Sequence, residues 1–230
     1  MKHVVVLSGA GMSADSGLAT FRDSGGLWEG YDIHEVASIE GWRRDPEHVL
    51  DFYNKRRRQA FEAEPNAGHR TLAELEKNFK VTIITQNVDD LHERAGSSNV
   101  LHLHGELRKA RSEKNRNLVY DIGADPIKLG DTADDGAQLR PHIVWFGERV
   151  PMIEKSAEIV QEADIMIVIG TSLVVYPAAG LVDYGPNGIP KYIVDPSTPE
   201  LNSFSEWEHI KATAAKGTPV LKDKILNQLK

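Results

Sequence analysis

The sequence predicts an α/β protein with a Rossmann-like, doubly wound parallel sheet, a small inserted module and a helical insertion. Three observations carry this prediction. Short β-branched apolar runs alternate with helical segments, as in parallel sheets that helices cover on both faces. The first run, residues 4–7, opens directly into the glycine-rich turn Ser8-Gly9-Ala10-Gly11. Polar turns follow later runs as well, and a parallel sheet gathers such turns at one edge.

The expected elements follow one another along a single domain, residues 1–230. A helical insertion is expected over roughly residues 35–78, where Asp45-Pro46 starts a helix and Pro65-Asn66 interrupts the pattern. A further helix is expected over about 151–162. Short apolar runs between turn signals are typical of buried strands. They predict strands at 4–7, 81–85, 100–103, 143–146, 165–169 and 191–194.

The segment from about 106 to 140 differs in character from the rest, because it is charged and punctuated by Asp and Gly. We expect a small module there, without zinc. The chain contains no cysteine, which excludes disulfides and thiolate zinc sites, and His142 and the nearby acids lack paired ligand spacing. The module is then expected to depend on its own packing, through Leu118, Tyr120, Ile122, Ile127 and Leu129.

Composition argues against several function classes. The 230 residues are 40% hydrophobic and carry a formal net charge of −7, whereas broad nucleic-acid binding needs a basic surface. No apolar run reaches the length of a membrane span, and no signal-peptide pattern precedes Val4. We therefore expect a soluble, cytoplasmic protein that contacts neither nucleic acid nor membrane. Since no long apolar surface is evident, the expected state is a monomer.

The turn after the first strand has the features of a phosphate cradle. Gly9 permits the tight turn, and Gly11 lets backbone amides approach a pyrophosphate without a Cβ in the way. Ser13 and Asp15 fall where a helix is expected to begin. An ordinary strand-to-helix turn is the alternative. A dehydrogenase would need a second strand and an acid about twenty residues on, but residues 20–28 form a glycine-rich, aromatic segment that suits a lid.

Three more polar turns follow predicted strands. Gln86-Asn87-Val88-Asp89, His104-Gly105 and Gly170-Thr171-Ser172 each lie directly after, or just beyond, a strand. Because the ends of parallel strands meet at one edge, amide, carboxylate and imidazole groups should share a cleft with the cradle. This combination indicates a site that binds NAD and performs chemistry on it.

These segments resemble the motifs of the sirtuin family, in the family's order. The resemblance extends over nearly the whole chain, from about residue 3 to the C-terminal helix. It implies an enzyme that removes acyl groups from protein lysines with NAD as co-substrate. The matching segments are residues 9–17, Thr20-Phe21-Arg22, residues 85–92, His104-Gly105, Phe146-Gly147-Glu148 and Gly170-Thr171-Ser172-Leu173.

The resemblance also implies roles for individual residues. His104 would be the general base that deprotonates a ribose hydroxyl, with a structural histidine as the alternative. Asn87 and Asp89 would hold the nicotinamide carboxamide and twist it out of its resting pose. Phe21 would shield the reacting face, and Arg22 would hold the cofactor loop closed. The other expected NAD contacts are Gly9, Ala10, Gly11 and Ser13 at the pyrophosphate, Gln86 and Asp195 at the riboses, and Gly170, Thr171 and Ser172 on the adenosine side.

The family's reaction begins when the acyl-lysine carbonyl oxygen attacks the ribose carbon that bears nicotinamide. It ends with free lysine and O-acyl-ADP-ribose. The acylated peptide is expected to add as a strand between Phe146-Gly147-Glu148 and Val174-Val175. Such main-chain pairing reads the backbone more than the side chains, so sequence specificity should be loose.

A pair of residues in the helical insertion predicts the acyl group. Tyr53 and Arg56 share one helix face, and a phenol beside a guanidinium makes a receptor for a carboxylate. The pair matches the acidic-acyl branch of the sirtuins, and the small Ser24 leaves room for a longer acyl chain. We expect a preference for succinyl-, malonyl- or glutaryl-lysine over acetyl-lysine. A solvated basic helix face is the alternative, since Lys55, Arg57 and Arg58 surround the pair.

Three other functions stay open at this stage. A plain deacetylase would share every motif except the Tyr53 and Arg56 pair. An ADP-ribosyltransferase would share the NAD site and pass ADP-ribose to a protein nucleophile. A sensor would bind NAD without turnover, and the intact Asn87, Asp89 and His104 argue against it.

Overall fold

A computed structural model of the chain describes residues 1–20, 27–28, 30–199 and 204–227. Its central sheet has six parallel strands in the order β11-β10-β9-β1-β4-β5. The chain extends this sheet from β1 in both directions, so the predicted doubly wound α/β class is confirmed. The strands are β1 (His3–Ser8), β4 (Lys80–Thr85), β5 (Val100–His102), β9 (Ile165–Ile169), β10 (Lys191–Val194) and β11 (Glu208–Ile210).

The register of the sheet aligns the carboxyl ends of its middle strands. Ser8, the last residue of β1, pairs with Thr85 of β4 and with Ile169 of β9. Val194 of β10 lies opposite Ile169 in turn. The turns that follow these four strands therefore leave the sheet at one level, where the strand order reverses. Doubly wound sheets bind their ligands at this point.

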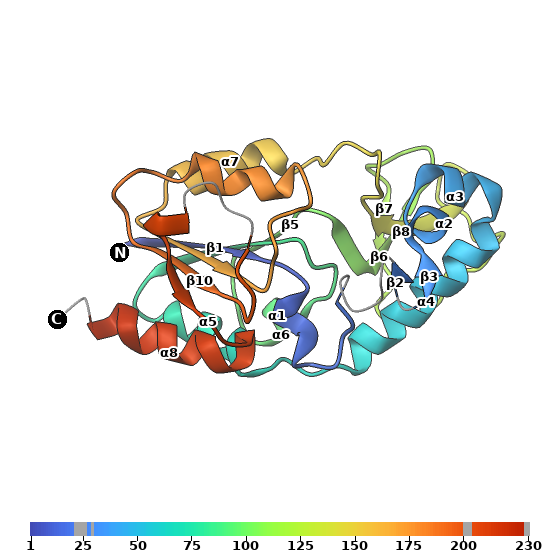
Figure 1. Cartoon of the computed structure of the whole chain (residues 1–230). Coiled ribbons are helices and arrows are strands. Elements are labelled where there is room, and N and C mark those ends of the chain that lie inside the picture. The colour runs from blue at the N-terminus through green and yellow to red at the C-terminus, as the bar shows by residue number, and fades with distance from the viewer. Residues whose placement is uncertain (21–26, 29, 200–203, 228–230) are drawn as a thin grey trace.

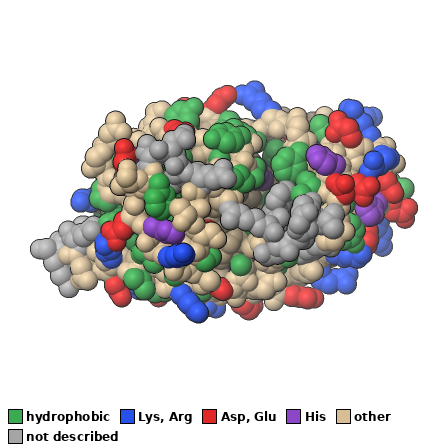
Figure 2. All heavy atoms as spheres, viewed as in Figure 1, with side chains coloured by type: hydrophobic (Ala, Val, Ile, Leu, Met, Phe, Trp, Pro, Cys, Tyr) green, Lys and Arg blue, Asp and Glu red, His purple; other side chains and the backbone are tan. Residues whose placement is uncertain are grey.

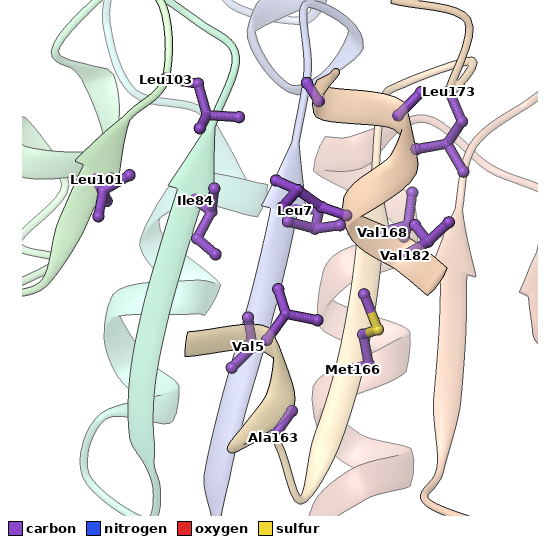
Figure 3. Close-up of a cluster of buried hydrophobic side chains, with 14 of the residues drawn as sticks. Val5, Leu7, Ile84, Leu101, Leu103, Ala163, Met166, Val168, Leu173 and Val182 are labelled. Carbon is purple, nitrogen blue, oxygen red and sulfur yellow. The ribbon is translucent and has the colours of Figure 1, made fainter. Parts of the chain in front are cut away.

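Helices cover both faces of the central sheet (Figure 1). On one face, α5 (Ala67–Leu75) and α8 (Ala214–Asn227) pack over Val4 and Val6 of β1. On the other, α7 (Ile153–Gln161) and the 3₁₀ helix η1 (Ala178–Tyr184) cover Val5 and Leu7, which lie beside Met166 and Val168 of β9 (Figure 3). Alternate residues of β1 thus enter two separate cores, as expected for a strand buried on both faces.

The helical insertion begins and breaks where the sequence predicts. The Asp45 carboxylate accepts a hydrogen bond from the His48 amide at 3.0 Å, and Pro46 stands in the first turn of α4 (Pro46–Glu62). After α4 ends, Asn66 and His69 form a capping box that starts α5. The shorter elements are α1 (Gly11–Ala14), α2 (Ile33–Val36), α3 (Ile39–Arg44), α6 (Leu91–Arg94), η2 (Phe204–Glu206), and the paired β2 (Leu27–Trp28) and β3 (Tyr31–Asp32).

A second, antiparallel sheet lies with α2, α3 and α4 at the end of the molecule remote from both termini (Figure 1). Its order is β7 (Val119–Asp121), β6 (Gly105–Ser112) and β8 (Leu139–Ile143). The predicted strand 143–146 is wrong, because β8 ends at Ile143 and belongs to this sheet. Beyond it the backbone changes partners: the Val144 amide donates to the His104 carbonyl, and the Phe146 amide donates to the Ala37 carbonyl.

The small sheet is held differently from the expected apolar packing. Ile127 is buried, but Leu129 is 58% exposed, so that expectation is correct only in part. A buried ion cluster also links the strands of this sheet. In it, the Glu148 carboxylate pairs with Arg111 and Arg140, at 3.1 Å each. Among the described residues, no group of three or more His, Asp or Glu is arranged to hold a metal ion.

Within the described ranges, no helix is both long and apolar enough to cross a bilayer.

Candidate active site

A cavity of about 510 Å³ lies at the carboxyl ends of β1, β4, β9 and β10. Every expected site residue in the described part of the chain lines it, whereas Phe21, Arg22 and Ser24 lie outside the described residues. The lining residues named from sequence are Gly9, Ala10, Gly11, Ser13, Tyr53, Arg56, Gln86, Asn87, Asp89, His104, Phe146, Gly147, Glu148, Gly170, Thr171, Ser172, Val174, Val175 and Asp195.

Two glycine turns meet at the cavity. The Gly9 amide donates to the Ile169 carbonyl at 3.0 Å, and the Gly11 amide donates to the Gly170 carbonyl at 2.9 Å. A Cβ on Gly11 would lie 2.7 Å from the Cα of Gly170, which itself has a φ of +61°. Only glycine meets these two conditions without strain. Gly11 thus allows two loops of the protein to approach each other closely. The amides of Gly9 and Gly11 already donate hydrogen bonds within the protein.

Ser13 serves a different purpose from the predicted helix start. A short helix does begin there, α1 from Gly11, with Ser13 in its first turn, but the residue before the helix makes no side-chain cap. The buried Ser13 hydroxyl instead donates to Asp89 Oδ2 and accepts from Asn87 Nδ2, both at 3.0 Å. These three side chains form one hydrogen-bonded unit, which fixes the Asn87 amide and the Asp89 carboxylate in place.

The Asp89 carboxylate is nearly enclosed. It is 8% exposed, and its Oδ1 accepts from the Leu91 amide at 3.2 Å. Burial raises the pKa of Asp89, while the Leu91 amide and the Ser13 hydroxyl act in the opposite direction. Asn87 and Asp89 together present an amide and a carboxylate at one wall of the cavity. A carboxamide ligand has the complementary donors and acceptor.

His104 is arranged as a base. Its Nδ1 lies 3.1 Å from the Gln86 carbonyl oxygen, which can only accept, so Nδ1 carries the proton and Nε2 keeps a lone pair. Burial lowers the pKa of His104, and the Gln86 carbonyl opposes this only in part. The imidazole is therefore neutral near pH 7. Gly105, at φ +83°, is required next to it because a Cβ would collide with the His142 carbonyl.

His102 is a residue that positions Asn87 and that the sequence analysis did not single out. Its Nδ1 lies 3.0 Å from the Asn87 carbonyl, and its Nε2 lies 2.8 Å from Glu93 Oε1. Both partners accept, so the two nitrogens satisfy both bonds only as an imidazolium. Burial alone would lower the pKa of His102, but the hydrogen bond and charge of Glu93 outweigh it and raise the pKa. His102 thus anchors the backbone of Asn87. No motif signals this bond, because Glu93 comes from another element.

Tyr53 and Arg56 lie on the buried face of α4, with 0% and 8% of their surface exposed. The alternative of a solvated basic face is wrong for Arg56, and also for Arg57, whose Nε donates to the Leu107 carbonyl at 2.6 Å. Trp145 Nε1 donates to the Tyr53 hydroxyl oxygen at 3.0 Å. Burial raises the pKa of the Tyr53 phenol, so it keeps its proton as a donor. No pattern in the sequence indicates this contact with Trp145, which lies 92 positions away.

The two segments expected to hold a peptide face the same cavity. Phe146 is 45% exposed and Val174 is 49% exposed, so each presents an apolar edge at the rim. Gly147, which follows Phe146 and also lines the cavity, has a φ of +84°. The Glu148 side chain, by contrast, points into its cluster of arginines and is 4% exposed. Its carboxylate is therefore committed to the small sheet.

Comparison with known proteins gives one consistent family. A family model described as the Sir2 family matches residues 9–177. An NAD-dependent protein deacylase of Helicobacter pylori (strain J99) is 61% identical over 196 residues, covering 85% of this chain and 83% of the relative. Another, from Bacteroides thetaiotaomicron, is 52% identical over 231 residues, covering 98% and 99%. The fold is similar to that of a solved Sir2 homologue in complex with NAD, with a TM-score of 0.89, 39% identity, and coverage of 100% of this chain and 91% of that one.

Proposed function

The chain belongs to the Sir2 family, and we propose that it removes acyl groups from protein lysines with NAD as co-substrate, preferring succinyl, malonyl or glutaryl groups. The deacylase part rests on the family and on the names of its relatives. The preference for acidic acyl groups rests on one observation, the buried Tyr53 and Arg56 at a wall of the same cavity as His104.

The residues present fit NAD. Gly9 and Gly11 place no side chain of their own against the Gly170–Ser172 turn, so a diphosphate would meet main chain and small groups such as the Thr171 side chain there. Asp195, 8% exposed at the end of β10, would accept from ribose hydroxyls. When bound, NAD supplies a ribose carbon from which nicotinamide departs.

Asn87 and Asp89 would orient the leaving nicotinamide. Ser13 holds Asn87 and Asp89 in one hydrogen-bonded unit, and His102 fixes the Asn87 backbone. A preorganised amide and carboxylate cost no reorganisation at the moment of reaction. They would turn the carboxamide out of its resting pose and exclude water from it.

His104 would move the proton. Its neutral Nε2 is the acceptor in the cavity wall, and Nδ1 is fixed by the Gln86 carbonyl. Taking a proton from a ribose hydroxyl would make that oxygen a nucleophile toward the acyl carbon. One water molecule would be consumed as the bond between acyl carbon and lysine nitrogen breaks, so that lysine would leave as the free amine and the acyl group would stay on the ribose.

The acyl chain would end against α4. Arg56 provides the positive charge, and the Tyr53 phenol keeps its O–H free to donate because Trp145 already donates to its oxygen. A carboxylate needs donors of this kind, and a charge-assisted pair away from water is worth more than one in solvent. An acetyl group has no carboxylate to offer, so burying it against the same wall gains less.

The peptide would lie between residues 146–148 and Val174-Val175, paired through main-chain hydrogen bonds. Both segments line the cavity, and their exposed apolar residues frame its rim. Strand addition of this kind makes few demands on side chains.

Replacement of Arg56 by Met tests the acyl preference, with Arg58→Met on the exposed side of the same helix as control. Steady-state kcat/KM would be measured by mass spectrometry on one peptide that carries either succinyl- or acetyl-lysine. We expect Arg56→Met to lower kcat/KM for the succinyl peptide about thirtyfold or more, the scale of a lost charge-assisted bond of about 2 kcal/mol. The acetyl peptide and the control variant should change little. Equal losses on both peptides would overturn the receptor assignment.

A further inference from the structure

A second cavity, of about 580 Å³, lies between the small sheet and α3, and nothing in the deacylation chemistry uses it. Figure 1 shows these elements side by side at one end of the molecule, and Figure 2 shows charged side chains of both signs gathered at that end. We call this cavity the basic pocket. Its cationic lining residues are Arg43, Arg111, Lys114, Arg116 and Arg140.

The basic pocket carries more positive than negative charge. Five cations face two carboxylates, Glu113 and Glu148, in a chain whose formal net charge is −7. Glu113 accepts from the Trp42 indole N–H at 3.3 Å rather than from a cation. Glu148 is therefore the carboxylate that pairs directly with cations of the lining, and the five cations outnumber the two carboxylates in a chain that is acidic as a whole.

The deep part of the basic pocket is the most unbalanced. One carboxylate, that of Glu148, pairs with Arg111, Arg116 and Arg140 at 3.1, 3.3 and 3.1 Å. The side chains of Arg111 and Arg140 are only 7% and 6% exposed. Buried charges are normally matched one to one, so this cluster holds more cation than it neutralises.

The excess of positive charge affects the pKa of Arg140. Burial, followed by the nearby charge of Arg111, lowers the pKa of Arg140 to about 10. Arg140 Nε is buried and has no hydrogen-bond partner in the described part of the chain. A second anion next to the cluster would relieve the repulsion. Arg43 and Lys114 stand at the exposed edge of the same cavity, where they can reach such an anion from solvent.

We propose that the basic pocket binds a small molecule with a diphosphate or triphosphate group. Guanidinium forks match phosphate oxygens in pairs, and several cations in one cavity suit an anion of multiple charge. The volume fits a ligand of nucleotide size. Trp42 and Ile39 add an apolar side to the lining, which would contact an organic portion of the ligand.

Titration calorimetry on the whole chain, in the absence of NAD, tests this inference, and variants of the basic pocket separate its binding from any binding in the active-site cavity. The probes are inorganic pyrophosphate, cytidine diphosphate and citrate. We expect saturable binding of pyrophosphate or cytidine diphosphate and much weaker binding of citrate. Tighter binding of cytidine diphosphate would identify a nucleotide as the source of the phosphates, and equal binding would identify free polyphosphate.

Variants at the exposed edge locate the site without disturbing the buried cluster. The double variant Arg43→Ala/Lys114→Ala should raise the Kd of the phosphate probe about tenfold or more, because two charge-assisted contacts are lost. Arg44→Ala is the matched control, since this neighbour pairs with Glu35 and does not line the basic pocket. The proposal is overturned by absence of saturable phosphate binding, by citrate binding equally well, or by the same Kd in the double variant and the control.

Discussion

The two cavities of this protein are built by different means. The active-site cavity is made by backbone: strand register brings four turns to one level, and glycines let two of those turns touch. The basic pocket is made by side chains, with Arg111 and Arg140 of the small sheet tied to Glu148 by buried ion pairs. A cavity whose shape depends on strand register should keep that shape when a lining side chain is changed. A cavity held by a few buried ion pairs should depend on each charged side chain.

This contrast separates chemistry from stability. Residues at the strand ends should affect turnover while the fold persists, and residues of the ion cluster should affect folding first. The predictions below test the division, starting with the largest effect.

Replacing His104 by Ala should remove catalysis and leave the cavity intact. A general base contributes about 10²- to 10⁴-fold to rate, so single-turnover deacylation should fall by that factor. NAD affinity, measured by calorimetry, should change little because the glycine turns are untouched. His34→Ala, on the exposed surface, is the control. If NAD binding falls as steeply as turnover, the imidazole has a structural role. The proposed separation of residues for turnover from residues for folding would then be wrong for His104.

Replacing Glu148 by Gln should destabilise the fold. It leaves two buried guanidiniums without their counter-charge, a change that costs about 3–5 kcal/mol. Urea unfolding would measure the loss. Glu154→Gln, which breaks the fully solvated pair with Arg149, should cost about 1 kcal/mol or less. A small loss for Glu148→Gln would show that the small sheet is held by packing after all.

Stability should fall as pH drops from about 6.5 to about 4. Burial lowers the pKa of His69 from its ordinary 6.5 to about 4 and lowers that of His92 as well. In this window the unfolded chain binds protons that the folded chain refuses, which for His69 is worth about 3 kcal/mol. The raised pKa of His102 acts with opposite sign, since its stabilising charge is lost as pH rises.

His69→Gln sharpens the pH prediction. Gln at this helix position can still accept the Asn66 amide, so the capping box survives while the titrating group is gone. Urea unfolding between pH 4 and 7 should then show a shallower decline than in the parent chain. Exposed His34→Gln should leave the slope as it is. An unchanged slope in His69→Gln would assign the acid sensitivity to other groups.

The sequence predicted the active-site cavity well for a physical reason. Strand identity is local, and once Val4 to Leu7 and the later runs are strands, sheet geometry places the turns after them together. Residues such as Asn87, His104 and Gly170 therefore needed no knowledge of long-range contacts. The buried face of α4 is predictable in the same way, because Tyr53 and Arg56 are separated by one helical turn.

The rest depends on pairs that are remote in sequence and follow no period. Glu148 with Arg111, Trp145 with Tyr53, and His102 with Glu93 all join different elements. The strand expected at 143–146 failed for the same reason, since the ladder ends at Ile143 and Trp145 packs instead against Trp42 and Tyr53 of the helical insertion. The link that the Ser13 hydroxyl makes between Asn87 and Asp89 is likewise one between remote segments, which the position of Ser13 in a helix start does not signal.

The most direct test of the central claim is turnover of one peptide bearing acetyl-lysine or succinyl-lysine, with and without NAD, followed by mass spectrometry. We expect NAD-dependent removal of the acyl group from the lysine, with the succinyl peptide strongly preferred. Preference for the acetyl peptide would contradict the role of Tyr53 and Arg56 while keeping the family's reaction. No release from either peptide with NAD bound would contradict the deacylase function itself.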